Sequence, residues 1–217
     1  MDGDFDLLPE ALMSYAETHT TPADAFLQAL ERDTYVNVLC PRMISGSYQG
    51  KLLEMLCRMI RPMRVLEVGT YTGYSAICMA KALPEGGRIT TIEHNEELQE
   101  RILRAFEKAQ VAQKIELLLG EAERILPGLP PGTFDFVFLD ADKAGYQGYY
   151  PLVKTLLAPG GWLLADNVLW NGKVYASSCH DKDTLSVRAF NEAVQKDTEV
   201  ENLLLPVRDG LMLVRKK

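Results

Sequence analysis

The sequence lacks several features that would assign it to a class at once. It has no run of about 20 apolar residues that could cross a membrane, and its first residues, MDGDFDLLPEAL, have no continuous apolar stretch of a signal peptide. Lysine and arginine do not cluster beyond the last three residues, and the net charge is −7, so nothing supplies the basic face of a nucleic-acid binder. We therefore expect a cytoplasmic protein with neither a nucleic-acid nor a membrane partner.

Paired cysteines are also missing. The four cysteines, Cys40, Cys57, Cys78 and Cys179, show no C-x-x-C spacing. Two of them lie inside apolar helical patterns, where a free thiol behaves as a small hydrophobic side chain. The spacing predicts four reduced, structural thiols rather than disulfides or a zinc site.

What is present is a change of apolar pattern near residue 60. Before it, spacings of three and four predict helices at residues 9–18, 23–38 and 47–60, with Thr21 as N-cap and Pro22 at the start of the second. After it, short runs rich in Val, Ile, Leu and Phe predict strands at 64–68, 88–92, 114–119, 134–139, 162–165, 200–206 and 211–214. Helical patterns at 75–82, 96–110, 121–126, 146–157 and 184–196 separate them.

This alternation predicts an α/β fold. Continuous apolar strands indicate a parallel sheet covered by helices on both faces, and Asp209-Gly210 between the last two runs predicts an antiparallel hairpin. We expect a Rossmann-like, doubly wound, mostly parallel seven-stranded sheet with that C-terminal hairpin. The expected organisation is one domain, 1–217, with a helical extension (1–60) and a core that binds cofactor and metal (61–217). Ligands bind such sheets at the carboxyl ends of the strands.

Two glycines follow the first expected strand, in Glu67-Val-Gly-Thr-Tyr-Thr-Gly-Tyr-Ser75. Without a Cβ, Gly69 and Gly73 let the chain turn sharply close to a ligand, and the next helix offers free N–H groups to a carboxylate. A β–α turn without a ligand gives the same pattern, and G-x-G-x-x-G is absent. Glu93, however, ends the second strand, where an acid accepts hydrogen bonds from ribose hydroxyls. Together these features predict a nucleoside-type cofactor.

Acidic residues follow the fourth and fifth expected strands. Asp140 ends one strand, and Asp166 with Asn167 ends the next. If these strands are neighbours, the three side chains converge, and their oxygens suit Mg²⁺ or a similar ion. Taken singly, each aspartate is explained equally well as a strand-end carboxylate or a turn cap.

The segment 67–75 resembles the first motif of class I S-adenosylmethionine-dependent methyltransferases. Leu-Asp-Ala-Asp-Lys (139–143) and Asp-Asn-Val-Leu-Trp-Asn-Gly-Lys-Val (166–174) resemble the metal-dependent caffeoyl-CoA and catechol O-methyltransferase-like group, and the likeness runs from residue 43 to residue 211. By this resemblance S-adenosyl-L-methionine would be bound by Ser45, Glu67, Gly69, Thr70, Ser75, Glu93, Ala122 and Asp140. The metal (Mg²⁺, or Ca²⁺ or Mn²⁺) would be bound by Asp140, Asp166 and Asn167, and the acceptor by Asp142, Trp170 and Asn171. Many members have Asp where this chain has Glu93, but the catechol branch has Glu.

The expected chemistry is methylation of a catechol-like aromatic hydroxyl. A phenol is mostly protonated at neutral pH, and a divalent cation stabilises its oxyanion. Lys143, three residues after Asp140, is the expected general base, contributing on the order of 10²–10⁴-fold; a surface lysine or a counter-charge for Asp142 is the alternative. The acidic N-terminal arm gives little support for binding coenzyme A phosphates, so a free phenol is preferred to a thioester.

Two other classes remain open. A nicotinamide-dependent oxidoreductase has a similar sheet, but the missing third glycine argues against it. A non-catalytic S-adenosylmethionine-binding module is opposed by the intact set Asp140, Lys143, Asp166 and Asn167. The amphipathic N-terminal helices offer apolar surface for a homodimer, which we also expect.

Overall fold

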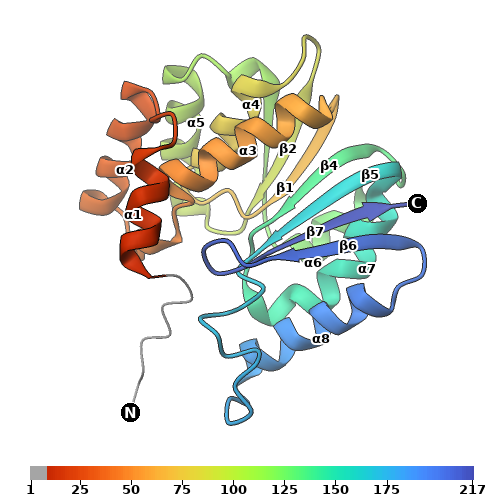
Figure 1. Cartoon of the computed structure of the whole chain (residues 1–217). Coiled ribbons are helices and arrows are strands. Elements are labelled where there is room, and N and C mark those ends of the chain that lie inside the picture. The colour runs from red at the N-terminus through yellow and green to blue at the C-terminus, as the bar shows by residue number, and fades with distance from the viewer. Residues whose placement is uncertain (1–8) are drawn as a thin grey trace. The chain divides into compact units, whose positions relative to one another are not determined.

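The computed structural model describes residues 9–217 (Figure 1). The acidic start of the chain, residues 1–8, lies outside the described residues. Contacts between residues define two compact units: Tyr15–Ala122, and Glu123–Lys217 with the described residues before Tyr15. Helix α1 (Glu10–Thr18) runs from the second unit into the first. Of the helices described, none has the length and hydropathy of a membrane span.

The unit 15–122 contains three parallel strands in the order β3-β2-β1. The strands are β1 (Arg64–Val68), β2 (Arg88–Glu93) and β3 (Ile115–Leu119). The helices are α2 (Ala25–Asn37), α3 (Gly46–Ile60), α4 (Tyr74–Ala82) and α5 (Gln99–Lys108), with short 3-10 turns η1 (Pro41–Met43), η2 (Glu96–Leu98) and η3 (Ala112–Lys114). Helices α3 and α4 pack against each other, and β1 is buried along four of its five residues.

The start of α2 differs from the prediction. The sequence predicted Thr21 as N-cap and Pro22 as the first helical residue, but the helix begins at Ala25 with Asp24 as its N-cap. The Asp24 carboxylate accepts a hydrogen bond from the Leu27 amide at 3.0 Å, so it satisfies one of the free N–H groups of the first turn. Aspartate is as good a cap as threonine, and here it lies three residues further along.

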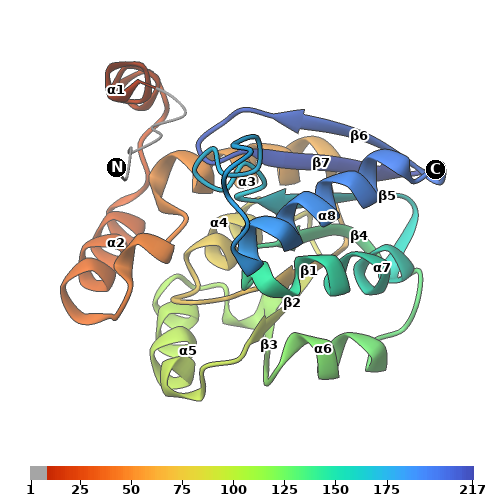
Figure 2. The same ribbon diagram turned by 90° about the horizontal axis from the view of Figure 1, so that it is seen from below.

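The other unit contains four strands in the order β4-β5-β7-β6. Its elements are α6 (Ala122–Ile125), η4 (Leu126–Gly128), β4 (Phe134–Leu139), η5 (Lys143–Gly145), α7 (Tyr146–Leu156), β5 (Leu157–Asp166), α8 (Lys182–Lys196), β6 (Val200–Leu205) and β7 (Leu211–Lys216). Strands β4 and β5 are parallel, and β7 runs antiparallel to both β5 and β6. Figures 1 and 2 show α7 and α8 side by side on one face of these strands.

Strand β5 is longer than predicted, because it begins at Leu157 rather than at residue 162. Pro159-Gly160-Gly161 lies within β5, where Gly160 has a left-handed backbone (φ 78°) and the register shifts against β4. A Cβ on Gly161 would lie 3.0 Å from the carbonyl oxygen of Phe134. Glycine therefore lets β5 approach β4 closely at this irregular point.

The seven strands belong to one mixed sheet with an antiparallel C-terminal pair, which confirms the predicted fold class. The four cysteines are free thiols, as predicted. The single domain over residues 1–217 stays a prediction.

Candidate functional site

The glycine turn after β1 has the backbone that the sequence required. Gly69 and Gly73 have φ values of 101° and 84°, in the left-handed region that favours glycine. At Gly73 space is short as well, since a Cβ would lie 2.7 Å from Cε1 of the buried Phe106. The amides of Gly69 and Thr70 both donate to the carbonyl of Ile92, which ties the turn to β2.

A buried carboxylate organises this turn. Glu67 is fully buried at the penultimate position of β1, and each of its oxygens accepts a hydroxyl hydrogen bond at 2.5 Å, from Ser75 on α4 and from Thr91 on β2. The Thr91 proton is used in that bond, so Thr70 Oγ1, 2.6 Å away, must donate to Thr91 Oγ1. Four predicted or neighbouring polar side chains therefore form one network. Sequence reasoning missed Thr91, because a threonine in a strand interior is typical of ordinary packing.

Glu93 lies at the carboxyl end of β2, as predicted, and is almost fully buried. Its Oε2 accepts the Tyr71 amide at 2.7 Å and its Oε1 accepts the Asn95 amide at 2.8 Å. These bonds fix the orientation of the carboxylate, and each oxygen retains a further lone pair for a ligand hydroxyl.

The remaining predicted cofactor residues, Ser45, Ala122 and Asp140, do not all lie in the same unit. Ser45 immediately precedes α3 and Ala122 begins α6, and both are buried. They belong to the same unit as Glu67 and Glu93, whereas Asp140 belongs to the other.

In the second unit, the predicted acidic residues meet around Lys143. Asp140 follows β4 and Asp166 ends β5, two paired parallel strands, so both lie at the same edge. The Lys143 ammonium lies 3.2 Å from Asp140 Oδ1 and 3.4 Å from the backbone carbonyl of Asp166. Lys143 is only 8% exposed. The alternative of a surface lysine is therefore wrong, and the carboxylate that pairs with Lys143 is that of Asp140 rather than Asp142.

A tyrosine that the sequence did not reveal holds this lysine. Tyr146, fully buried in the first turn of α7, accepts from Lys143 Nζ at 2.7 Å and donates to the Asp166 carbonyl at 2.8 Å. Burial and the nearby carboxylates raise the pKa of Tyr146 far above its usual value, so the hydroxyl stays protonated. The ammonium also lies 4.4 Å from the centre of the Tyr146 ring.

The cluster carries an excess of negative charge. Burial, with the charge of Asp166, raises the pKa of Asp140 to about 6, although Lys143 opposes the shift. Asp209, in the turn before β7, is a third carboxylate; burial and then Asp166 raise its pKa, while hydrogen bonds from the Asn171 amide and the Asn167 side chain lower it. This role of Asp209 was not predictable from the sequence, because a hairpin turn fully explains Asp-Gly.

Asp142 has structural partners. Its Oδ2 caps the η5 turn by accepting the Gly145 amide at 3.0 Å, and its Oδ1 accepts the Tyr149 hydroxyl at 2.6 Å. A Cβ on Gly145 would lie 2.4 Å from Tyr149, so the turn needs glycine there. Asp142 is nevertheless exposed, at the same edge as Asp140.

Trp170 and Asn171 lie in the turn-rich segment 167–181 between β5 and α8. Both have left-handed backbones, with φ values of 48° and 51°. The Asn171 amide donates to Asp209 Oδ1 at 2.5 Å, which ties the segment to the β6–β7 turn. The indole Nε1 of Trp170 is buried with no hydrogen-bond partner among the described residues. A buried unpaired donor is uncommon and is typical of a site that binds a ligand or water.

Asp140, Asp166 and Asn167 fit a hard divalent cation by their chemistry, because they offer two carboxylates and an amide oxygen. Electrostatics agrees, since the charge of Asp166 raises the pKa of Asp140 and of Asp209. Within residues 9–217, no group of three or more His, Cys, Asp and Glu side chains has the arrangement of metal ligands. The metal site therefore stays a prediction.

Comparison with known proteins gives concordant matches. The sequence profile of the family described as O-methyltransferase matches residues 17–217. The mouse catechol O-methyltransferase domain-containing protein 1 is 40% identical over 77% of this chain, but the match spans only 66% of the mouse protein. Caffeoyl-CoA O-methyltransferase 5 of Nicotiana tabacum is 38% identical over 80% of this chain and 77% of its own length.

Solved structures agree with these relatives. The SAH-bound methyltransferase PaMTH1 of Podospora anserina has a TM-score of 0.88 and 28% identity, covering 97% of this chain and 98% of its own. The O-methyltransferase TomG of Streptomyces achromogenes, solved in complex with SAM, has a TM-score of 0.86 and 31% identity, covering 95% and 96%.

Proposed function

Since the chain belongs to the O-methyltransferase family, as an S-adenosylmethionine-dependent enzyme, we propose that it methylates a hydroxyl of a small catechol-like acceptor with a divalent metal. The single observation that supports this most is the meeting of Asp140, Asp166 and Lys143 at the carboxyl ends of β4 and β5. A buried lysine paired with the partly buried Asp140 carboxylate, next to the buried Asp166, costs stability, so this arrangement favours a chemical role.

The residues of the unit 15–122 would hold the cofactor, which supplies a methyl group on a positively charged sulfur. Glu93 would accept hydrogen bonds from the ribose hydroxyls, and Ala122 would lie near the adenine. Ser45, Glu67, Gly69, Thr70 and Ser75 would hold the methionine part, and Asp140 would also contribute. The free amides at the start of α4 favour the cofactor's carboxylate.

Asp140, Asp166 and Asn167 would hold the metal, which when bound supplies a Lewis acid that stabilises an oxyanion. Mg²⁺ suits this oxygen set, and Ca²⁺ and Mn²⁺ are alternatives. Chelation should therefore abolish methyl transfer while cofactor binding remains.

Lys143 would remove the proton from the acceptor hydroxyl as general base. The Tyr146 hydroxyl and the Asp166 carbonyl orient its amine, and Asp140 is within 3.2 Å. Asp140, which pairs with the Lys143 ammonium in this structure, would turn to the cation when the metal is bound. Trp170 would contact the aromatic ring of the acceptor, and Asp142 and Asn171 its polar groups.

The decisive experiment is a methyl-transfer assay with catechol, caffeate and a flavonoid, with Mg²⁺ and with excess chelator. We expect activity that needs the metal and that Asp140→Ala or Asp166→Asn abolishes, with S-adenosylmethionine binding largely intact. Full activity in chelator would refute the metal role. Cofactor binding without any transfer would favour a non-catalytic module, and binding of a nicotinamide cofactor instead would favour an oxidoreductase.

The general base is tested separately. Lys143→Met should lower the rate most at low pH, where the acceptor hydroxyl is hardest to ionise. Lys182→Met, at an exposed position at the start of α8, is the matched control and should leave the rate unchanged. An unchanged pH–rate profile for Lys143→Met would remove this lysine from the mechanism.

Assembly and location complete the proposal. Exposed apolar side chains gather on the N-terminal helices, among them Tyr35 and Val36 on α2 and Met55 and Met59 on α3, and they would suit a homodimer interface. The cytoplasmic location and the preference for a free phenol over a thioester stay predictions from the sequence.

A further inference from the structure

The segment 167–181, which carries Trp170 and Asn171, needs outside support to keep its shape. Asn167, Trp170 and Asn171 all have φ between 48° and 56°, a region that costs a non-glycine residue on the order of 1 kcal/mol. Such a conformation persists only where surrounding contacts hold it. Asp209 and Gly210 of the β6–β7 turn accept the amides of residues 168, 169 and 171, and helix α8 holds residues 173–179, whose first amide, that of Lys173, donates to the Trp170 carbonyl at 2.9 Å.

Arg188 of α8 makes an unusual set of contacts with this segment. Its guanidinium donates four hydrogen bonds of 2.6–2.8 Å, all to backbone carbonyls. The acceptors are the carbonyls of Lys173, Val174, Ala176 and Cys179. A planar guanidinium with five N–H donors can gather carbonyls from several directions, which a lysine ammonium cannot do at this span. The Arg188 side chain therefore holds the backbone of residues 173–179 through these four hydrogen bonds.

Two other polar residues of α8 hold the neighbouring loops. Asn191, three residues after Arg188, donates to the Val168 carbonyl at 2.8 Å, next to Asn167. Ser186 donates to the Ala144 carbonyl at 3.1 Å, next to Lys143. The helix thus contacts both loops that carry the proposed metal ligands and base.

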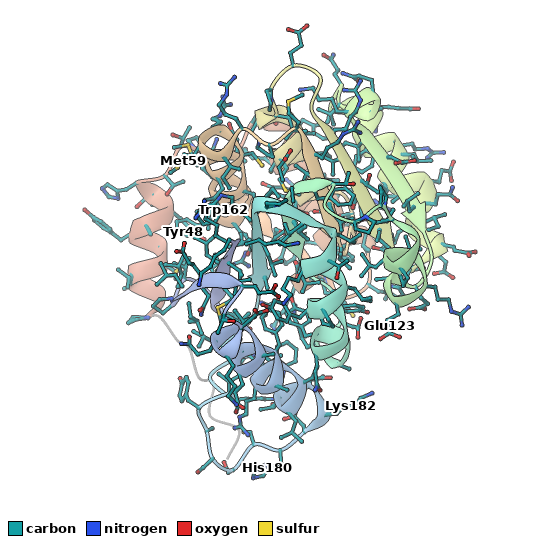
Figure 3. The ribbon with its side chains drawn as sticks, turned by 90° about the vertical axis from the view of Figure 1, so that its right-hand side faces the viewer. Tyr48, Met59, Glu123, Trp162, His180 and Lys182 are labelled. Atoms are coloured by element: carbon teal, nitrogen blue, oxygen red, sulfur yellow. The ribbon has the colours of Figure 1, made fainter. Side chains whose placement is uncertain are left out.

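The helix itself is fixed by a different set of residues. Val187, Phe190 and Val194 are fully buried, and the Phe190 ring packs edge-on against Tyr146 and Tyr150 of α7 at 5.3 and 5.7 Å. Since this apolar side anchors α8, loss of Arg188 should release the segment and leave the helix in place. In Figure 3, His180 and Lys182 mark the point where the segment enters α8.

We propose that Arg188 is the positioning residue of the acceptor segment: it fixes residues 173–179 and, through them, Trp170 and Asn171. In this role it sets the affinity for the aromatic acceptor and selects which of two adjacent hydroxyls is methylated. The inference rests on the proposed function, because Trp170 and Asn171 are acceptor contacts only within that proposal.

The test compares Arg188→Lys and Arg188→Met with the control Arg215→Lys, whose side chain is exposed on β7. For both Arg188 variants we expect the KM for catechol-type acceptors to rise about tenfold or more, which is about 1.4 kcal/mol per factor of ten. We expect kcat to fall less and the Kd for S-adenosylmethionine to stay within about twofold. With an acceptor bearing two different hydroxyls, the ratio of products should move toward equality.

Amide hydrogen exchange of the ligand-free protein supplies an independent measurement. The amides of Lys173, Tyr175, Ala176 and Cys179 are hydrogen-bonded within the segment, so they should be protected in the native protein and exchange faster in both Arg188 variants. Amides of α8 should keep their protection. Trypsin should also cleave faster after Lys173.

The outcomes separate the two proposals. Unchanged exchange of residues 173–179, or an unchanged acceptor KM and product ratio in an active variant, overturns the role of Arg188 alone. Absence of methyl transfer by the native protein overturns the proposed function, and the acceptor role of Arg188 with it, even if exchange shows that Arg188 holds the segment. If Arg188→Met does not fold, Arg188→Lys, which keeps the charge and the stem, gives the same comparison.

Discussion

Gly73→Ala should destabilise the protein more than an alanine at Gly132, a left-handed glycine with open space around it. Gly73 has φ of 84°, and an added Cβ would lie 2.7 Å from Cε1 of Phe106, which is 1% exposed. The left-handed backbone costs alanine about 1–2 kcal/mol, and displacing a close-packed buried ring costs roughly 1–3 kcal/mol more. The expected loss in free energy of unfolding is therefore about 2–5 kcal/mol.

The matched control is Gly132→Ala. Gly132 has φ of 65°, and a Cβ there would meet nothing within 4 Å, so only the backbone cost of about 1–2 kcal/mol remains. Urea unfolding followed by circular dichroism measures both losses, and the difference between them isolates the contact with Phe106.

A double-mutant cycle identifies the ring as the cause. Phe106→Leu removes the ring atom that the new methyl group meets, so it should cost less stability in the Gly73→Ala background than in the native protein. Equal destabilisation by Gly73→Ala and Gly132→Ala, or no coupling between residues 73 and 106, would refute the reasoning.

Three further predictions follow from contacts elsewhere in the chain. Although burial opposes ionisation of Asp197, hydrogen bonds from Lys154, the Glu199 amide and Tyr150 lower its pKa. The stability that this carboxylate contributes is therefore present above its unfolded pKa of about 4 and is lost as the pH falls through the lower folded pKa. Asp197→Asn should cost about 1–2 kcal/mol of unfolding free energy at pH 7 and progressively less below pH 4, which acid titrations of unfolding will test. Burial raises the pKa of Cys57 and Cys78 to about 12, and the charge of Glu67 adds to the shift at Cys57. A thiol reagent near pH 8 should therefore label the exposed Cys40 quickly, and should label Cys57 and Cys78 only on unfolding. Early labelling of Cys57, detected by mass spectrometry, would contradict this. Thr91→Val, which removes the hydroxyl bonded to Glu67, should weaken S-adenosylmethionine binding about tenfold in calorimetry, whereas Thr90→Val, whose hydroxyl is 3.4 Å from Glu116, should not; equal effects would contradict the role of the network.

Most element boundaries were predictable from the sequence, because apolar runs and helical spacing report burial directly. Strands 64–68 and 134–139 agree residue for residue with β1 and β4. Errors arose where local chemistry allows two outcomes: Asp24 replaced Thr21 as a cap, and β5 begins at Leu157 and includes Pro159-Gly160-Gly161, whereas the predicted strand began at residue 162.

The acidic residues of the candidate site were predictable from the sequence, whereas the residues that contact them were less so. Asp140 and Asp166 follow strands, and strand ends are placed by topology, so their proximity follows from the sheet. The burial of Lys143 depends on Tyr146, and the role of Asp209 depends on a turn brought back by β7. Arg188 looks like a solvated helix residue, because the carbonyls that it gathers belong to an aperiodic segment.

The position of β7 has a consequence for how the protein is made. This strand follows β6 in the chain but is inserted between β5 and β6. Until residues 211–216 have left the ribosome, β5 has no partner on that side, and its unpaired N–H and C=O groups are open to pairing with other chains. Truncation or slow translation within residues 211–216 should therefore lead to aggregation of the nascent chain, rather than to a folded protein that lacks activity.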